Sequence, residues 1–257
     1  AGTLQADLAR RDFTINAMAL DLVANELIDL HHGSEDLESG ELRFLHAGSV
    51  QDDPTRVIRA ARYAARLGFQ LAEESSEQIR STMDQWPWSW RQGDPTAAAP
   101  PALATRLRME LERLLEREPW QQALDLLEQW QALPLLDSQL QNDPRRTQRL
   151  HWARRLGLPL MPSLLLGAAD PVAVAQRLQI PRRHQQWLQQ CGELRDWLVD
   201  TPPPSEASPS IWSTAIEQQG WLPEVVALAV TLKPKQWKPL LRWWGRWRRI
   251  QAPQTAR

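Results

Sequence analysis

The sequence predicts an α+β fold, mostly α, with a small sheet near the start and helices thereafter. Apolar and small residues run almost without interruption from Phe13 to Leu22, and after the polar Asn25-Glu26 comes Leu27-Ile28-Asp29-Leu30. These two runs predict two strands joined by a short turn. From Asp53 onwards, apolar residues recur at the three- and four-residue spacing typical of helices. A chain of 257 residues is long enough for one or two domains.

The helix that begins at Asp53-Pro54 is marked at both ends. Asp suits the N-cap, Pro suits the first helical position, and Gly68 suits the C-terminal cap. Between these ends, one face of the helix is apolar and another carries arginines. The apolar face consists of Val57, Ala61, Ala64 and Leu67, and the arginine face of Arg56, Arg59, Arg62 and Arg66.

The rest of the chain is expected to be helical apart from one brief strand and two breaks. The strand is expected at 42–44, where Leu42 and Phe44 flank an arginine. The Pro-, Trp- and Ala-rich stretch 84–101 predicts a surface loop or insertion, and 201–204, Thr-Pro-Pro-Pro, predicts a stiff linker. Helices are expected at 103–118, 120–132, 144–156, 171–179, 182–199, 210–219, 223–232 and 236–250.

The composition limits the class of protein. A net charge of −1 predicts no overall attraction to nucleic acid, so any such contact must come from local clusters of Lys and Arg. The single cysteine, Cys191, excludes an intramolecular disulfide and a cysteine-cluster zinc site, and it fits a reducing cytosol. No run approaches ~20 apolar residues and the start has no signal-peptide pattern, so we expect a cytoplasmic protein without a membrane partner.

Two stretches together carry a family resemblance. Residues 10–20 read Arg-Arg-Asp-Phe-Thr-Ile-Asn-Ala-Met-Ala-Leu, and residues 53–62 read Asp-Pro-Thr-Arg-Val-Ile-Arg-Ala-Ala-Arg. The pair resembles signature motifs of the class II tRNA nucleotidyltransferases and bacterial poly(A) polymerases, enzymes that add nucleotides to RNA 3′ ends without a template. The resemblance is strong over 5–71, fair to about residue 140 and weak beyond. It implies substrates of ATP or CTP and a tRNA or other RNA 3′ end; the oligomeric state is left open.

Asp53 and Arg56 are the candidate base-reading pair. Three residues apart at a helix start, they lie on one side, so a carboxylate acceptor and a guanidinium donor point together. Cytosine and adenine each present an amine donor beside a ring-nitrogen acceptor, whereas uracil and guanine present the opposite order. The pair therefore accepts C and A and leaves a buried group unsatisfied against U and G, at roughly 1–3 kcal/mol per group. Arg59 and Arg62 are expected to clamp the triphosphate or the substrate backbone.

Each of these residues taken alone has a structural explanation. An Asp before Pro is more often a helix cap, and an arginine stripe is more often a solvated face. The joint occurrence with the upstream motif favours the functional reading. In that motif, the resemblance implies that Arg11 contacts the nucleotide phosphates, Asp12 orients arginines in the site, and Asn16 lies near the sugar.

Two further stretches extend the resemblance. Residues 28–37, Ile-Asp-Leu-His-His-Gly-Ser-Glu-Asp-Leu, resemble a third family motif that couples the head to the neck. Residues 105–111, Thr-Arg-Leu-Arg-Met-Glu-Leu, are similar to a neck helix, with Thr105 in place of the usual acid. Because adjacent histidines point apart, His31 and His32 are not expected to bind a metal.

Nucleotidyl transfer requires two metal ions held by clustered carboxylates on a rigid strand. The sequence contains no Asp-x-Asp, and its two Glu-x-Glu pairs, at 110–112 and 116–118, fall on a predicted helix where such side chains diverge. We therefore expect no catalytic residue in this chain and Mg²⁺ bound by ligands outside it.

The resemblance also implies an order of domains. We expect the C-terminal part of a nucleotidyltransferase β-sheet head at 1–47 and, at 48–135, neck helices with base recognition and the insertion at 84–101. A helical RNA-binding body is expected at 136–200, a proline-rich linker at 201–209 and a basic, Trp-rich helical tail at 210–257. In the tail, cations interleaved with tryptophans suit an RNA backbone; they are Lys235, Lys238, Arg242 and Arg246. An amphipathic helix with tryptophans packed inwards accounts for the same pattern.

Three hypotheses follow. The favoured one is a C-terminal portion of a tRNA nucleotidyltransferase or poly(A) polymerase. The second is a catalytically inactive, truncated module that binds nucleotide or RNA. The third is a helical scaffold in which the motif is a coincidence.

Overall fold

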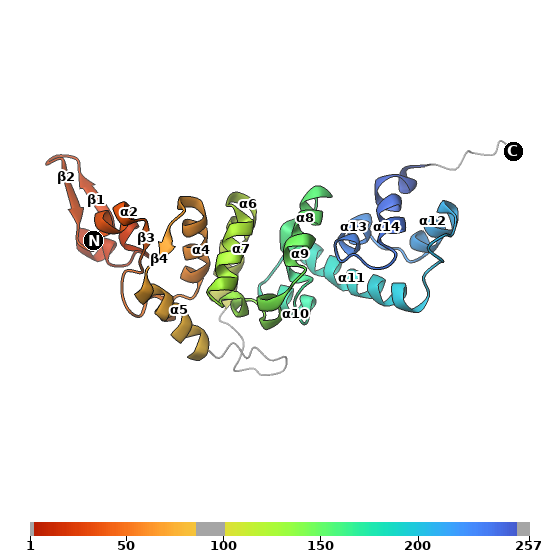
Figure 1. The fold of residues 1–257 in the computed structure, drawn as a ribbon, viewed down its shortest axis with the longest axis horizontal. Coiled ribbons are helices and arrows are strands. Elements are labelled where there is room, and N and C mark those ends of the chain that lie inside the picture. The colour runs from red at the N-terminus through yellow and green to blue at the C-terminus, as the bar shows by residue number, and fades with distance from the viewer. Residues whose placement is uncertain (1–2, 86–100, 251–257) are drawn as a thin grey trace. The chain divides into compact units, whose positions relative to one another are not determined.

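The computed structural model describes residues 3–85 and 101–250 and divides into two compact units, Ala1–Asn142 and Asp143–Arg257 (Figure 1). Helices predominate, and the sheets of the described residues are two small ones near the start of the chain, which confirms the predicted fold class. Most of the predicted insertion at 84–101 lies outside the described residues. Within the described ranges, no helix combines the length and the apolar character needed to cross a bilayer.

The predicted hairpin is present, although its first strand is shorter than expected. Strands β1 (Met18–Asp21) and β2 (Glu26–Asp29) pair antiparallel. The first part of the run folds instead into the 3-10 turn η1 (Thr14–Asn16), where the Asn16 side chain accepts the Phe13 N–H at 3.2 Å. Phe13 and Ala17 are fully buried, so this apolar run reflects core packing as much as strand formation.

A second sheet joins the beginning of the unit to the residues that follow the arginine-bearing helix. Strand β3 (Glu41–Leu42) runs parallel to β4 (Gln70–Leu71), and Phe44 forms an isolated bridge with Phe13. The expectation that every element after Asp53 is helical is therefore wrong at β4. The reason is long-range pairing, which local periodicity does not contain: Gln70 N–H donates to the Gly40 carbonyl at 2.9 Å.

The helices of the first unit are built around α4, which packs on α6 and α7. In chain order they are α1 (Leu4–Leu8), α2 (Gly33–Ser39), α3 (Ser49–Asp52), α4 (Thr55–Leu67), α5 (Glu73–Gln85), α6 (Pro101–Arg117) and α7 (Trp120–Gln129), followed by the 3-10 turns η3 (Leu133–Leu135) and η4 (Ser138–Asn142). Of the predicted apolar stripe, only Leu67 departs, being 43% exposed. Gly68 caps the end of α4 at φ +73°, as predicted.

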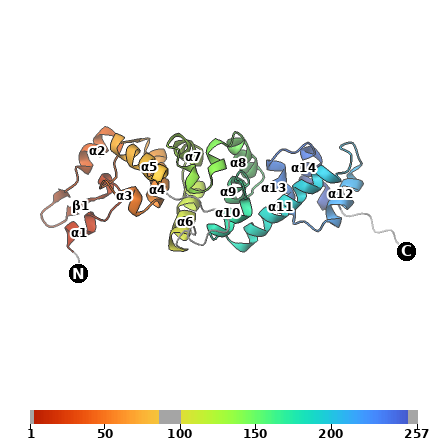
Figure 2. The same cartoon turned by 90° about the horizontal axis from the view of Figure 1, so that it is seen from below.

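The second unit is helical throughout its described part. Its elements are α8 (Arg146–Arg155), α9 (Leu160–Leu165), α10 (Pro171–Arg177), α11 (Arg182–Asp200), α12 (Pro209–Gln218), α13 (Pro223–Thr231), α14 (Trp237–Gly245) and η5 (Trp247–Arg249). Helix α13 is buried along most of its length and packs against α8, α11 and α14 (Figure 2). Helix α10 begins at residue 171 as predicted, with Asp170 as its N-cap, whereas α8 begins at Arg146, two residues after its predicted start.

A close backbone contact fixes the first helix after the hairpin. A Cβ built on Gly33, the first residue of α2, lies 2.3 Å from the Thr14 carbonyl oxygen. No flexible side-chain end can yield there, because the obstacle is backbone. The position therefore requires glycine, and α2 is held against η1.

We predict that Gly33→Ala lowers the free energy of unfolding by about 1–3 kcal/mol, because overpacking against backbone forces the two segments apart. Gly192→Ala is the matched control: Gly192 lies inside α11 with open space at its Cβ, and the change should stabilise by roughly 0.5–1 kcal/mol. Urea denaturation of both variants measures the two effects. Equal effects of the same sign would contradict the contact.

Candidate nucleotide-binding site

Asp12 lies between two arginines of α4. Its Oδ1 accepts from Nε of Arg56 at 3.1 Å, and its Oδ2 forms an ion pair with Nη2 of Arg59. The Asp12 carbonyl accepts the Leu45 N–H at 3.2 Å, which fixes the residue beside the second sheet. The structure therefore brings the two sequence motifs together through one carboxylate that is 17% exposed.

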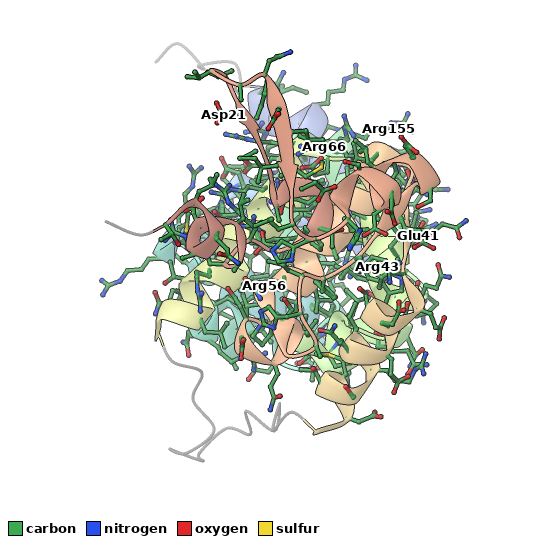
Figure 3. All side chains as sticks on the ribbon, turned by 90° about the vertical axis from the view of Figure 1, so that its left-hand side faces the viewer. Asp21, Glu41, Arg43, Arg56, Arg66 and Arg155 are labelled. Carbon is green, nitrogen blue, oxygen red and sulfur yellow. The ribbon has the colours of Figure 1, made fainter. Side chains whose placement is uncertain are left out.

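Arg56 is held rigidly by a second residue. Its Nη1 donates to both the carbonyl oxygen and the hydroxyl of Ser49, at 3.1 and 2.8 Å, and its side chain is 12% exposed (labelled in Figure 3). Ser49 is fully buried in α3. Sequence reasoning missed Ser49, because a serine four residues before the Asp53-Pro54 start carries no recognisable signal.

Asp53 caps the start of α4 and also forms an ion pair. The helix begins at Thr55, one residue later than an Asp53 N-cap implies, yet Asp53 Oδ1 accepts both the N–H and the hydroxyl of Thr55, at 3.1 and 2.7 Å. Its Oδ2 accepts from Nη1 of Arg106 at 2.8 Å. Asp53 and Arg56 thus stand at one helix entrance, joined by a backbone hydrogen bond of 3.0 Å, while their side chains engage different partners.

Two buried glutamates, Glu110 and Glu118, form ion pairs with the later arginines of α4. Arg59 Nη1 lies 3.7 Å from Glu110, and Arg59 Nε is buried without a partner in the structure. Arg62 pairs with Glu110 and, at 3.0 Å, with Glu118, which also binds Arg66. Glu110 lies on α6 and Glu118 just beyond its end.

Glu118 is charged although it is buried. Burial alone would raise the pKa of Glu118, but hydrogen bonds from Arg66 and Arg62 outweigh that effect and keep the pKa below its usual value. The arginines at the Arg66 end of the row are therefore paired with glutamates, whereas Arg59 keeps one donor without a partner in the structure. Sequence analysis considered Glu110 in a neck-helix likeness, and Glu110 and Glu118 in the two Glu-x-Glu pairs, but it did not predict that either pairs with the arginine row.

The two remaining nucleotide-site candidates of the first motif make local bonds. Arg11 pairs with Asp7 of α1 at 2.8 Å, and its side chain is 51% exposed. Asn16 accepts the Phe13 N–H within η1. Their described bonds hold each residue in its own turn and do not join it to the Asp12 cluster.

The third motif fastens the hairpin, η1 and α2 to one another. Asp29 caps α2, accepting the backbone N–H of Gly33 and of Ser34, both at 2.8 Å. The buried Asp36 accepts the Thr14 hydroxyl at 2.6 Å and pairs with Arg43 at 3.1 Å. Asp29 and Asp36 of this motif thus both have a structural use.

Arg43 extends this network towards α5. It also pairs with Glu41 at 2.6 Å and with Glu74 at 2.5 Å, and Figure 3 shows Arg43 and Glu41 together. Burial lowers the pKa of Arg43, but the bonds and charges of Asp36 and Glu74 outweigh it, so that the pKa is raised.

The four predicted RNA-binding cations of the second unit are exposed. Lys235 precedes α14, Lys238 and Arg242 lie on it, and Arg246 caps its end. Trp243 of the same helix is buried, as expected for an amphipathic helix, and Lys238 Nζ lies 5.9 Å from the Trp237 ring centroid. The exposed cations and the inward-facing tryptophan fit both an RNA-binding helix and an ordinary amphipathic helix.

Within the described residues, no three side chains of His, Cys, Asp or Glu gather in a way that could hold a metal ion. Cys191 is buried and free, and burial raises the pKa of its thiol to about 12. The described residues therefore offer no donor set suited to Mg²⁺, which prefers clustered carboxylate oxygens.

Comparisons with known proteins agree with the motifs. Residues 1–43 match the poly(A) polymerase head domain. The CC-adding tRNA nucleotidyltransferase of Deinococcus radiodurans is 36% identical over 196 residues, which is 71% of this chain and 46% of that protein. The CCA-adding enzyme of Pseudomonas putida is 35% identical over 74% of this chain and 50% of its own length. A multifunctional CCA protein of Laribacter hongkongensis is 50% identical over 82 residues, 32% of this chain and 20% of that protein.

Solved structures share the fold. A CCA-adding enzyme in its apo form II superimposes with a TM-score of 0.69 at 22% identity, over 95% of this chain and 58% of that one. A tRNA nucleotidyltransferase complexed with a primer tRNA and an ATP analogue superimposes with a TM-score of 0.65 at 21% identity, over 93% and 72%.

These similarities support membership of the class II tRNA nucleotidyltransferase and bacterial poly(A) polymerase family. The chain spans about half the length of the longer-matching curated relatives.

The Asp29 cap predicts an acid-sensitive contribution to stability. Burial raises the pKa of Asp29, but the hydrogen bonds from Ser34 and Gly33 outweigh it and lower the pKa from 3.8 to about 2. The contribution is therefore complete above pH 3.8 and is lost as the pH falls through 2, and it amounts to on the order of 1–2 kcal/mol. Urea unfolding of the wild type and Asp29→Asn at several pH values measures it. Their difference should shrink below pH 4; a constant difference down to pH 2 would contradict the cap.

Proposed function

We propose that this chain supplies nucleotide selection and RNA binding to an RNA 3′-end nucleotidyltransferase that uses ATP and CTP, for tRNA CCA, CC or A addition or for polyadenylation. The observation that carries the proposal is the Asp12 carboxylate holding Arg56 next to Asp53 at the entrance of α4. A protein template needs such fixed donors and acceptors, because discrimination depends on the group that a wrong base leaves unsatisfied.

In the proposed complex, Asp53 accepts from the exocyclic amine of C or A, and Arg56 donates to the ring nitrogen beside it. The bonds described for Arg56 use Nε and Nη1, so Nη2 is the proposed donor. Asp53 first has to release Arg106, whose side chain is 53% exposed; an exposed pair contributes ~1 kcal/mol or less. Base binding can therefore replace this pair at little cost in free energy.

The triphosphate clamp is assigned to Arg59 and Arg11. Arg59 carries a buried Nε without a partner, and an acceptor oxygen would satisfy it. Arg11 is half exposed, and the ion pair described for it is with Asp7 of α1, so a phosphate can compete for it. Arg62, shared between two buried glutamates, is proposed to keep the row in position, and Asn16 remains the candidate beside the sugar.

Mg²⁺ is proposed to bind to residues outside this chain, because the donors described here do not fit it. Exposed apolar side chains on the hairpin support the proposal that further structure covers this part of the head. Leu20 and Leu27 on its two strands are 55% and 57% exposed, and Val23 at the turn is 99% exposed. An apolar two-stranded sheet of this kind is stabilised by further strands or by a covering element.

RNA binding is assigned to the exposed cations of the tail helix, Lys235, Lys238, Arg242 and Arg246. The relatives named as tRNA-processing enzymes support tRNA as the RNA, and the single buried thiol supports a cytoplasmic location.

The alternative function is a catalytically inactive module that binds nucleotide or RNA. The lack of an Asp-x-Asp in the sequence favours it. The reading frame upstream distinguishes the two: a Gly-Gly-x-x-Arg-Asp loop followed by an Asp-x-Asp supports the transferase, and a start codon immediately before Ala1 supports the module.

We predict that the chain binds CTP and ATP more tightly than UTP and GTP, and that Arg56→Ala removes this preference. The expected loss for CTP is about tenfold, the effect of one hydrogen bond to a charged group. Isothermal titration calorimetry with the four triphosphates measures it.

Two variants make the result interpretable. Arg56→Lys keeps the charge but loses the planar guanidinium that contacts Asp12 and the base at the same time. It should therefore also lose the preference for CTP and ATP. Arg80→Ala removes an exposed arginine of α5 that pairs with Glu77 and should leave all four affinities unchanged. Circular dichroism checks that each variant is folded. A folded Arg56→Ala with unaltered CTP affinity would refute the base-reading role.

A further inference from the structure

The second unit contains a cavity of about 300 Å³ that the nucleotide site does not use. It lies among α8, α11 and the end of α13, with the loop that leads to α14. Its floor is apolar and includes Leu194 and Leu198 of α11. This volume falls at the lower end of the range for small-ligand sites, so it suits one planar group.

Four cations line the cavity, and no acid does. They are Arg145, Arg149, Arg195 and Lys233. Arg149 is buried and fixed: its Nη2 pairs with Asp143 at 2.5 Å and donates to the Leu164 carbonyl at 3.2 Å. The other three are exposed. Asp143 pairs with Arg149, and Asp196 lies 4.0 Å from Arg195 in a largely exposed pair, so the cavity rim carries a net positive charge.

Two of the three segments that supply these cations, those around α8 and α13, lack acids along a considerable length. No Asp or Glu occurs between residues 144 and 169, which include α8, or from 225 to the last residue, which include α13 and α14. Because α8 packs against α13, these two segments reinforce one positive field at the cavity. The whole chain has a net charge of −1, so this is a local feature.

Lys233 occupies a strained backbone position at the rim. Its φ is +49°, in the left-handed region that lysine rarely adopts. The conformation brings Nζ 5.5 Å from the ring centroid of Trp152, whose ring lies 5.8 Å from that of Trp237. Lys233 directly follows Leu232, the C-cap of α13, and helices commonly end with a residue in this conformation.

We propose that this cavity holds one unpaired nucleotide of the RNA, with its base on the apolar floor and its flanking phosphates on Arg145, Arg195 and Lys233. The inference rests on the proposed function and specifies the RNA. The base of a paired nucleotide is stacked inside its helix, so its face cannot contact the apolar floor. A phosphate alone has no apolar surface to place on that floor. An RNA chain with one nucleotide turned out of its helix supplies both a free base for the apolar floor and phosphates for the cations.

Three RNA duplexes of equal length and sequence test the proposal: one fully paired, one with a single bulged adenosine, and one with an abasic residue at the bulge. Fluorescence anisotropy measures their affinities for the 257-residue chain at fixed salt. We expect the bulged adenosine to raise affinity about tenfold over the paired duplex, and the abasic bulge to lose most of that gain.

Lys233→Gly and Arg195→Gln should each reduce the bulge preference about threefold or more, because each removes one phosphate contact. Glycine suits a φ of +49°, so Lys233→Gly should not destabilise the fold. Arg182→Gln is the matched control: it removes one exposed charge about 20 Å along α11 from Arg195 and should weaken all three duplexes alike.

Equal binding of the three duplexes, or an unchanged preference in Lys233→Gly and Arg195→Gln, overturns the inference. The nucleotide preference that depends on Arg56 is measured separately in the first unit. A chain that binds all duplexes equally therefore leaves the proposed function intact, whereas a chain that binds none also overturns its RNA-binding part.

Discussion

The interaction on which the first unit depends is the one between the Asp12 carboxylate and two arginines of α4. One carboxylate fixes Arg56 through Nε and Arg59 through Nη2, and so joins the residues before the hairpin to the arginine row of α4. A half-buried acid of this kind neutralises charges that would otherwise repel each other at neighbouring turns. The same carboxylate thus positions the first motif on α4 and holds Arg56 in the geometry that we propose reads the base.

Ion pairs continue along α4 and change in character from one end to the other. At Arg62 and Arg66 they are completed by buried glutamates, whose removal would leave cations without compensation, whereas Arg59 retains an unsatisfied donor. A row of chemically equal arginines is therefore divided by its acidic partners into a fully paired part and a part that we propose receives a ligand. In the second unit, Arg149 is likewise paired and fixed by Asp143, while its neighbours at the cavity are exposed.

The sequence predicted the parts of this arrangement that local chemistry determines. The hairpin, the extent of α4 and its Gly68 cap follow from periodicity and end signals, and the two motifs indicated which acids and arginines to examine. Partners that no local pattern marks escaped it: Ser49, Glu118 and strand β4 gain their roles only when the chain folds. Asp53 illustrates the limit, since its cap was predictable from the following proline but its pair with Arg106, fifty-three residues away, was not.

The most direct test of the central claim is the hydrogen exchange rate of the Arg56 Nε–H, observed by ¹⁵N NMR and assigned by its absence in Arg56→Lys. If Asp12 holds this group, the proton should exchange much more slowly than that of the exposed Arg80, and Asp12→Asn should remove the protection while the rest of the spectrum stays folded. An Arg56 proton that exchanges as fast as that of Arg80, or is indifferent to Asp12→Asn, would contradict the account.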